Sequence, residues 1–269
     1  MTTIRLLHHL ARTGGTLISR CLSGMRGVTV LSEVHPAGAG VARQFDPLFQ
    51  AQYWYKLLPA GEAQGLRDAD APFAARIAAI AARAAERDER LVLRAWSHLD
   101  YIGRPFIPAP AGRLALREAL ADTFRVVETT TVRHPAAQWL SWERFVPAGG
   151  VSLAEFMAGV RAFAEDAAAI GFLRYEDLCA NPDHGLAELC WRLELDFDPE
   201  YAYRWFFCRT VSGDLDGLDR YRIEPVGPPR LTAEVADALD ANADYHRALE
   251  LLGYDHVGTT TPVAAAALR

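Results

Sequence analysis

Residues 12–16, with the sequence Arg-Thr-Gly-Gly-Thr, could bind a phosphate group. They follow a short apolar run over residues 4–10 and precede residues 17–22, whose apolar positions have helical spacing. A glycine-containing turn between a strand and a helix binds anions, because the first helical amides lack partners and the helix dipole is positive there. The two glycines would let a phosphate approach the backbone, and side-chain donors would come from Arg12, Thr13 and Thr16. The simpler alternative is an ordinary glycine turn that caps a helix.

Two parts of a magnesium-dependent nucleotide site are missing from the sequence. The common nucleotide loop GxxxxGK[ST] has a lysine after its second glycine, but Thr16 follows Gly15 here. The strand expected over residues 124–132 runs into Arg133 and does not end in an Asp suited to magnesium. We therefore expect a phosphate site without a metal ion, in which arginine supplies the positive charge.

Arg133 and Ser141 could form a second anion site. A helix is expected to start at Pro135, between them, because proline suits the first helical turn. Arg133 precedes this helix, so the chain can fold back and bring the guanidinium and the Ser141 hydroxyl to one phosphate. The alternative is a surface ion pair for Arg133 and a neutral helix position for Ser141. Three aromatic residues of the same helix are expected in the core: Trp139, Trp142 and Phe145.

Short buried strands alternate with helices along the chain, which predicts an α/β fold with a mostly parallel central sheet and helices on both faces. No internal repeat or long linker divides the sequence. We therefore expect one domain over residues 1–256 and an unordered tail over residues 257–269. Strands are expected over residues 4–10, 28–31, 90–95, 124–132 and 170–174, and helices over residues 17–22, 74–87, 113–122, 135–146, 152–168, 183–194 and 232–252.

Composition narrows the class of protein. A formal net charge of −6 disfavours the broad basic surface of a nonspecific nucleic-acid binder. The four cysteines form no CxxC pair and no zinc spacing, which is typical of buried thiols in a reducing compartment. The N-terminus has no secretory pattern, and no apolar run approaches the roughly 20 residues that span a membrane. We expect a cytoplasmic protein without nucleic-acid or membrane partners; the sequence does not indicate its oligomeric state.

The two candidate anion sites resemble those of the sulfotransferase family. Residues 12–16 resemble the loop of that family that binds the 5′-phosphosulfate group. Residues 132–135 (Val-Arg-His-Pro) and Ser141 look like its 3′-phosphate motif, including the step of eight residues from arginine to serine.

Two later segments extend this resemblance in the order that the family has. Residues 173–178 (Leu-Arg-Tyr-Glu-Asp-Leu) and the Asn-Pro pair at 181–182 are similar to its RYEDL…NP segment. The polar stretch over residues 212–225 and the last helix, which ends Leu-Gly-Tyr at 252–254, also fit. The resemblance covers residues 4–255.

The resemblance implies a three-layer, P-loop NTPase-like fold, and 3′-phosphoadenosine-5′-phosphosulfate (PAPS) as the sulfuryl donor. The expected enzyme is a PAPS-dependent sulfotransferase that uses no metal and releases 3′,5′-ADP. Two departures, Arg12 where cytosolic animal enzymes have lysine and Gly15 where many members have threonine, place the chain nearer the bacterial and the carbohydrate- or protein-modifying branches. Donor binding is assigned by the resemblance to Arg12, Thr13, Gly14, Gly15, Thr16, Leu17, Arg133, Ser141 and Tyr175.

Transfer to a hydroxyl group needs a general base, and two residues at the ends of expected strands qualify. Glu33 follows the second strand, at a spacing that resembles the base of tyrosylprotein sulfotransferases. His98 follows the third strand, a few residues beyond the histidine of the cytosolic enzymes. A histidine titrates near neutrality, whereas a glutamate base must be desolvated. We favour Glu33, keep His98 as the alternative, and place His35 third; Arg12 would stabilise the leaving phosphate.

The acceptor is expected to be a small molecule with a hydroxyl group. Aromatic residues on the loops expected near it favour an apolar or aromatic acceptor, although each could equally pack in the core. Two other functions remain open: a metal-independent P-loop phosphotransferase, and a catalytically inactive module that binds the nucleotide. The aromatic residues concerned are Tyr53, Trp54, Tyr55, Trp96 and Phe106.

Overall fold

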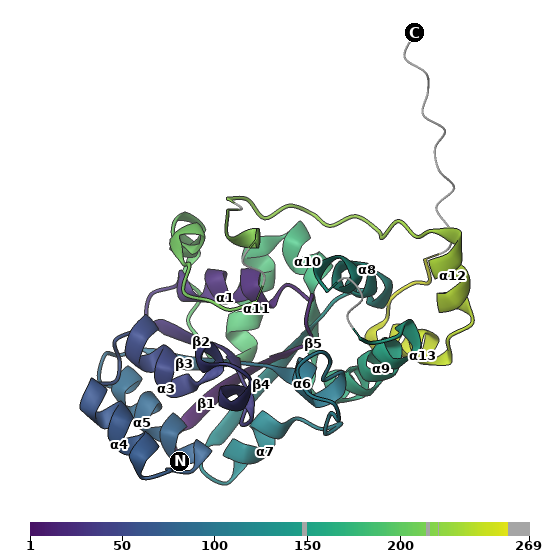
Figure 1. The fold of residues 1–269 in the computed structure, drawn as a ribbon. Coiled ribbons are helices and arrows are strands. Elements are labelled where there is room, and N and C mark those ends of the chain that lie inside the picture. The colour runs from purple at the N-terminus through teal and green to yellow at the C-terminus, as the bar shows by residue number, and fades with distance from the viewer. Residues whose placement is uncertain (147–149, 214–215, 220, 258–269) are drawn as a thin grey trace.

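The computed structural model describes residues 1–146, 150–213, 216–219 and 221–257 (Figure 1). Within these residues, five strands form one parallel sheet in the order β2-β3-β1-β4-β5. This confirms the α/β fold with a parallel central sheet. The tail expected over residues 257–269 lies outside the described residues, apart from Val257. The strands are β1 (Thr3–His9), β2 (Val28–Val34), β3 (Arg90–Ala95), β4 (Arg125–Val132) and β5 (Phe172–Arg174).

Helices cover both faces of the sheet because the central strands are apolar on both sides (Figure 1). Leu6 of β1 packs with α5 (Phe73–Ala85) and α7 (Ala115–Ala121) on one face. The next residue, Leu7, packs on the other face with α1 (Gly15–Ser23) and α11 (Pro182–Arg192). The result is the three-layer architecture that the sequence predicted.

A helical group packs beside the β5 edge of the sheet and forms its own apolar cluster (Figure 1). The single helix expected over residues 232–252 is two helices, which corrects the prediction. The break lies at Asn242, whose side chain accepts a hydrogen bond from the Tyr245 amide at 2.8 Å and so starts a new helix. The group comprises α8 (Pro135–Phe145), α9 (Leu153–Ile170), α12 (Ala233–Asp240) and α13 (Ala243–Leu252).

Short helices occupy segments that the sequence left irregular. One example is α3, where the Asp46 side chain accepts from the Leu48 amide and caps the turn. No helix in the described part of the chain is long and apolar enough to cross a membrane. The additional helices are α2 (Gly38–Val41), α3 (Pro47–Phe49), α4 (Ala60–Asp68), α6 (Ser97–Tyr101) and α10 (Tyr175–Ala180). A π-helical turn covers Gln50–Trp54, and 3₁₀ turns cover Arg43–Phe45, Pro199–Tyr203, Trp205–Phe207 and Asp216–Asp219.

Strand register brings several polar side chains to one edge of the sheet. Leu7 of β1 pairs with Arg94 of β3, and His9 pairs with Thr131 of β4. Because all strands run in the same direction, their carboxyl ends meet at this edge, which is where open α/β sheets bind ligands. An extended segment, residues 221–232, runs along the same side of the molecule towards α12 (Figure 1).

Candidate active site

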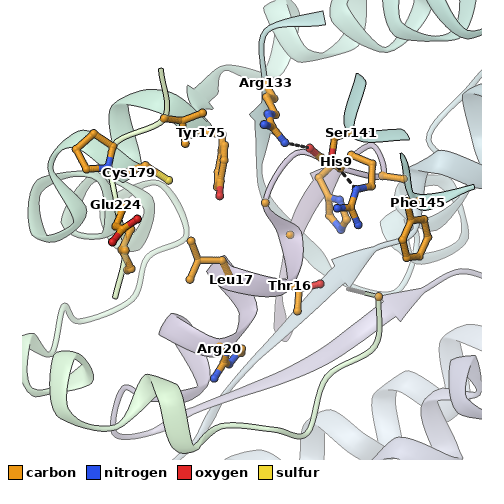
Figure 2. Close-up of a pocket in the computed structure, with 18 of the residues that line it drawn as sticks. His9, Thr16, Leu17, Arg20, Arg133, Ser141, Phe145, Tyr175, Cys179 and Glu224 are labelled. Carbon is orange, nitrogen blue, oxygen red and sulfur yellow. Dashed lines mark hydrogen bonds between the residues drawn. The ribbon is translucent and has the colours of Figure 1, made fainter. Parts of the chain in front are cut away.

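A cavity of about 1090 Å³ opens at the carboxyl edge of the sheet (Figure 2). Its walls come from the β1–α1 loop, the ends of β2 and β3, helices α8 and α10, and residues 221–227. A volume of this size can hold a nucleotide together with a small second substrate. Among the described residues, six arginines line it: Arg12, Arg20, Arg94, Arg133, Arg144 and Arg222.

The β1–α1 loop presents the start of α1 to this cavity. Gly14 precedes α1 with a left-handed φ of 86° and offers no side chain to cap the helix amides. A Cβ atom on Gly14 would lie 2.2 Å from the Tyr175 ring, and one on Gly15 would lie 2.5 Å from the His9 ring. Close packing therefore favours glycine at both positions, and the left-handed backbone favours it at Gly14 as well. No side chain caps the first amides of α1, and such uncapped amides are the geometry that binds anions at helix N-termini; that they bind a phosphate here stays a prediction.

The two predicted anion sites meet in one cluster (Figure 2). Arg12 Nε donates to Ser141 Oγ at 2.9 Å, and Arg133 Nη1 donates to the Arg12 carbonyl at 3.1 Å. The Arg133 guanidinium lies over the Tyr175 ring, 5.3 Å from its centre, and burial lowers the pKa of Arg133. Its Nε atom is buried and has no hydrogen-bond partner among the described residues. A buried donor of this kind is costly unless a ligand accepts from it.

Some of the predicted site residues line the cavity, whereas others only hold the surrounding chain in place. The Thr13 hydroxyl donates to the Leu10 carbonyl at 2.8 Å and does not line the cavity, whereas Thr16 and Leu17 do. In the segment over residues 174–178, only Tyr175 lines the cavity. The residues on either side of Tyr175 bind other parts of the chain instead, including the end of α13. Arg174 donates to the Leu252 carbonyl, and Glu176 accepts from the His134 amide and from the Tyr254 hydroxyl.

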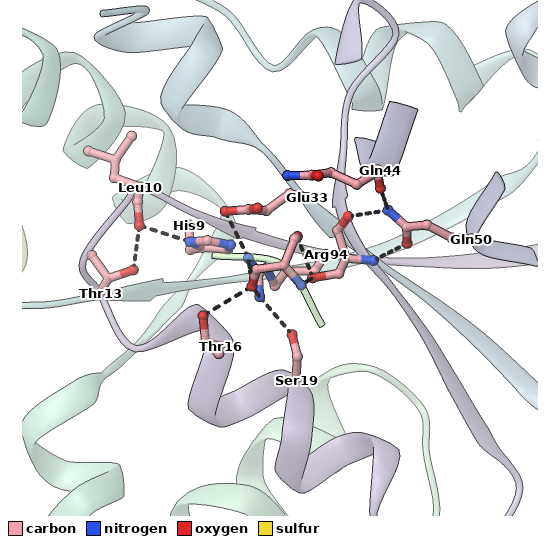
Figure 3. A network of polar contacts seen from close by, with 11 residues as sticks. His9, Leu10, Thr13, Thr16, Ser19, Glu33, Gln44, Gln50 and Arg94 are labelled. Carbon is pink, nitrogen blue, oxygen red and sulfur yellow. Dashed lines mark hydrogen bonds and ion pairs between the residues drawn. The ribbon is translucent and has the colours of Figure 1, made fainter. Parts of the chain in front are cut away.

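Glu33 lies at the end of β2 with its carboxylate at the cavity wall. Its backbone is left-handed, with φ of 52°, where the β2–β3 register shifts between Leu31 and Val34. Such strained conformations persist where the surroundings fix them, often at functional sites. Arg94 Nη2 lies 2.9 Å from Glu33 Oε1, and burial lowers the pKa of Arg94 (Figure 3).

The two histidines considered as bases lie outside the cavity lining. His98 is fully buried, shares a hydrogen bond of 2.8 Å with the Arg104 carbonyl through Nε2, and packs on Trp142. The Nε2 atom of His35 lies 3.0 Å from Asp100 Oδ1. The structure therefore separates Glu33, which faces the cavity, from His98 and His35, which do not.

Burial of His98 leads to a pH prediction. Burial lowers the pKa of His98 to about 4, whereas an unfolded histidine titrates near 6.5. Between these values the unfolded chain binds a proton that folded His98 does not, so stability falls as the pH drops. From pH 7 to 4.5, His98 alone should cost about 2 kcal/mol of unfolding free energy. Urea denaturation should show a smaller loss for His98→Gln than for the wild type; an equal loss in both would contradict the prediction. His184→Gln, at an exposed position, is the control.

Several residues that line the cavity were not predicted from the sequence. His9, the last residue of β1, shares a hydrogen bond of 2.8 Å with the Leu10 carbonyl through Nδ1, and burial lowers its pKa to about 3. A polar residue at the end of an apolar strand was the available signal for His9. Residues 221–225 belong to the polar stretch that resembles the family, but nothing in that stretch marked them as cavity residues. Arg94, Arg20 and Arg144 were also missed.

Expectations for the aromatic residues need correction. Phe145, expected in the core, is 45% exposed, lines the cavity and packs against Arg12, whereas Trp139 and Trp142 are buried as predicted. The aromatic residues expected near the acceptor do not line this cavity. Trp96, for example, is buried just before α6 and packs between Phe45 and Phe106. The residues concerned are Tyr53, Trp54, Tyr55, Trp96 and Phe106.

Comparison with known proteins identifies the fold. No protein-family model and no curated protein matches the sequence. The structure is similar to the sulfotransferase domain from the Synechococcus PCC 7002 olefin synthase, with a TM-score of 0.66 and 20% identity over 94% of this chain and 95% of that chain. It is also similar to the sulfotransferase domain from the curacin biosynthetic pathway, with a TM-score of 0.64 and 17% identity over 96% of this chain and 99% of that chain. The chain therefore has the P-loop-like fold of sulfotransferase domains, as the resemblance implied.

Proposed function

We propose that this protein is a sulfotransferase that moves a sulfuryl group from PAPS to a hydroxyl group of a small molecule and releases 3′,5′-ADP. The observation that carries the proposal is the cluster at the start of α1. There, uncapped helix amides, Arg12, Ser141 and the partly unsatisfied Arg133 face one cavity. Two phosphate-bearing ends of one nucleotide would satisfy both parts of this cluster.

The chain's own residues supply the charges that sulfuryl transfer needs. Transfer of this kind resembles in-line phosphoryl transfer, in which negative charge develops on the leaving oxygen. Arg12 and the first amides of α1 would stabilise that oxygen, since fixed donors at such a position contribute several kcal/mol. Arg133, Ser141 and the Tyr175 ring would hold the 3′-phosphate end. Positive charge comes from these arginines, so the proposed step uses no metal ion.

Glu33 is the proposed general base for the acceptor hydroxyl. Its carboxylate lines the same cavity as Arg12 and Thr16, whereas His98 points its one bonded nitrogen at a backbone carbonyl away from the cavity. A general base must reach the proton that it removes. Phe145 lines the same cavity beside Arg12, and its apolar ring favours an acceptor with an apolar or aromatic part.

Calorimetric titration with 3′,5′-ADP and with magnesium-ATP tests the donor site. We expect binding of 3′,5′-ADP in preference to magnesium-ATP. Arg133→Ala should weaken that binding about 10- to 100-fold, the usual loss for a charged hydrogen-bond donor. Arg247→Ala, at an exposed residue paired with Glu250 on α13, is the matched control and should bind as the wild type does.

A panel of hydroxyl compounds then tests transfer itself. The panel comprises a phenol, an aliphatic alcohol, a hexose and a tyrosine-containing peptide, each with PAPS. Preference for magnesium-ATP would support a P-loop phosphotransferase and contradict the proposal. Tight binding of 3′,5′-ADP without transfer to any panel member would support an inactive nucleotide-binding module.

A further inference from the structure

Arg94 is a fully buried cation beside the proposed base. It lies near the carboxyl end of β3 and is 1% exposed. Its Nη2 atom lies 2.9 Å from Glu33 Oε1, and its two terminal nitrogens donate to the Ser212 carbonyl at 3.4 and 3.5 Å (Figure 3). Nη1 also lies 3.4 Å from Ser19 Oγ of α1. Removal of such a guanidinium from water is costly unless an opposite charge remains close.

Glu33 supplies that opposite charge, and this restricts where its carboxylate can go. The Glu33 side chain is 12% exposed, so the pair is shielded from solvent on most sides. Rotation of the carboxylate into the cavity would leave the Arg94 charge buried and unpaired. Arg94 therefore fixes the carboxylate at the cavity wall, with one side on the guanidinium and the other towards the open space.

The same guanidinium connects the carboxylate to the phosphate loop. The Ser212 carbonyl, which accepts from Arg94, also accepts from Thr16 Oγ1 at 3.3 Å. Thr16 is the second residue of α1, next to the loop glycines, and Ser19 lies on the following turn. Arg94 thus holds Glu33 at a fixed position relative to the helix start that would bind the donor. Alignment of this kind matters because in-line transfer depends on the geometry of base, acceptor and leaving group.

Backbone contacts at Ser212 and Gly213 also restrict the Glu33 side chain. The Ser212 amide donates to Ser32 Oγ at 3.0 Å, and Ser32 is bonded through its amide to Gln50 Oε1 at 2.7 Å. Gly213 has φ of 96°, and a Cβ atom there would lie 2.8 Å from Thr16 Oγ1 and 3.3 Å from Glu33 Oε1. Glu33 is therefore held between its own strained backbone and the chain at Gly213, with Arg94 as the charged contact.

We propose that Arg94 is the positioning residue for Glu33, which it holds in line with the start of α1 and so with the leaving phosphate. This inference rests on the proposed function. It assigns Arg94 no contact with the transferred group, so its effect on the reaction passes through the Glu33 carboxylate.

A double-mutant cycle tests the proposal, with PAPS and the panel hydroxyl compound that the wild type sulfates fastest. Arg94→Met should lower kcat about 100-fold, the scale of loss for a misplaced group, with little change in the KM for PAPS or in 3′,5′-ADP affinity. Arg94→Lys, which keeps the charge, should recover part of the loss. The variant Glu33→Gln with Arg94→Met should be no slower than Glu33→Gln alone, because Arg94 acts only through Glu33.

The outcomes are distinct. Losses that multiply in the double variant would mean that Arg94 acts independently of Glu33 and would overturn the inference, as would an Arg94→Met protein with wild-type kcat. If Arg94→Met does not fold, the double variant, in which both charges of the pair are absent, still gives the comparison with Glu33→Gln, once thermal unfolding shows that Glu33→Gln, which leaves Arg94 without its carboxylate, is folded. No transfer by the wild type to any panel member would overturn the proposed function and this inference with it, a failure visible before any variant is made.

Discussion

Glu33→Gln is expected to slow sulfuryl transfer by about 100- to 10,000-fold, the usual contribution of a general base. Glutamine keeps the size of the side chain and can still accept from Arg94, but it cannot take a proton from the acceptor. Affinity for 3′,5′-ADP should stay unchanged, because Glu33 belongs to the acceptor side of the cavity and not to the arginine and serine cluster. Steady-state kinetics with PAPS, together with calorimetry, measure both quantities.

The matched control is His98→Gln, which tests the other candidate base. It should leave kcat close to the wild-type value, because His98 is buried against Trp142 and bonded to the Arg104 carbonyl. Thermal unfolding of each variant separates loss of the base from loss of the fold. A Glu33→Gln enzyme with full activity, or a His98→Gln enzyme with a loss of several hundredfold at unchanged stability, would reverse the assignment.

Local sequence patterns were sufficient for the layers of the fold and for the strand, turn and helix that contain the candidate phosphate loop. The strand, glycine turn and helix over residues 4–22 depend on neighbours within a few positions, as do the proline at the start of α8 and the buried strands. These features follow from backbone conformation and from burial of one face, which short segments encode. The short helices within residues 37–71 and the break at Asn242 were not predicted, because weak caps and short turns compete there with tertiary packing.

Sequence motifs identified only some of the residues that the structure brings together at the candidate site. Arg12, Arg133 and Ser141 were singled out, but their connection spans more than a hundred positions in the chain and no local pattern reports it. Arg94 stood in an apolar strand and gave no sign that Glu33 and Ser212 would surround it. Spacing also could not separate Glu33 from His98. The structure distinguishes the two residues, because Glu33 lines the cavity whereas His98 is fully buried away from it. Burial is a property of the assembled fold.

Gly14→Ala is expected to abolish donor binding at concentrations that saturate the wild type. Gly14 has φ of 86°, where a Cβ atom costs about 1–2 kcal/mol, and that atom would lie 2.2 Å from the Tyr175 ring. Either the loop or the ring must move. The Arg133 guanidinium lies over the Tyr175 ring, so a shift of the ring would displace Arg133 together with the start of α1. We expect 3′,5′-ADP affinity to fall at least about 100-fold and unfolding free energy to fall by about 2–4 kcal/mol.

Gly61→Ala is the matched control for this substitution. Gly61 lies within α4, where an added methyl group would meet no atom of the described residues within 4 Å. Alanine there should raise stability by about 0.5–1 kcal/mol without any effect on binding, because the backbone is already helical. Calorimetry with 3′,5′-ADP and urea denaturation of the two variants give the comparison. If Gly14→Ala folds and binds 3′,5′-ADP as tightly as Gly61→Ala does, the start of α1 is not the phosphate site. A loss confined to Gly14→Ala would support a donor site built from the start of α1 and the Arg133–Tyr175 contact beside it.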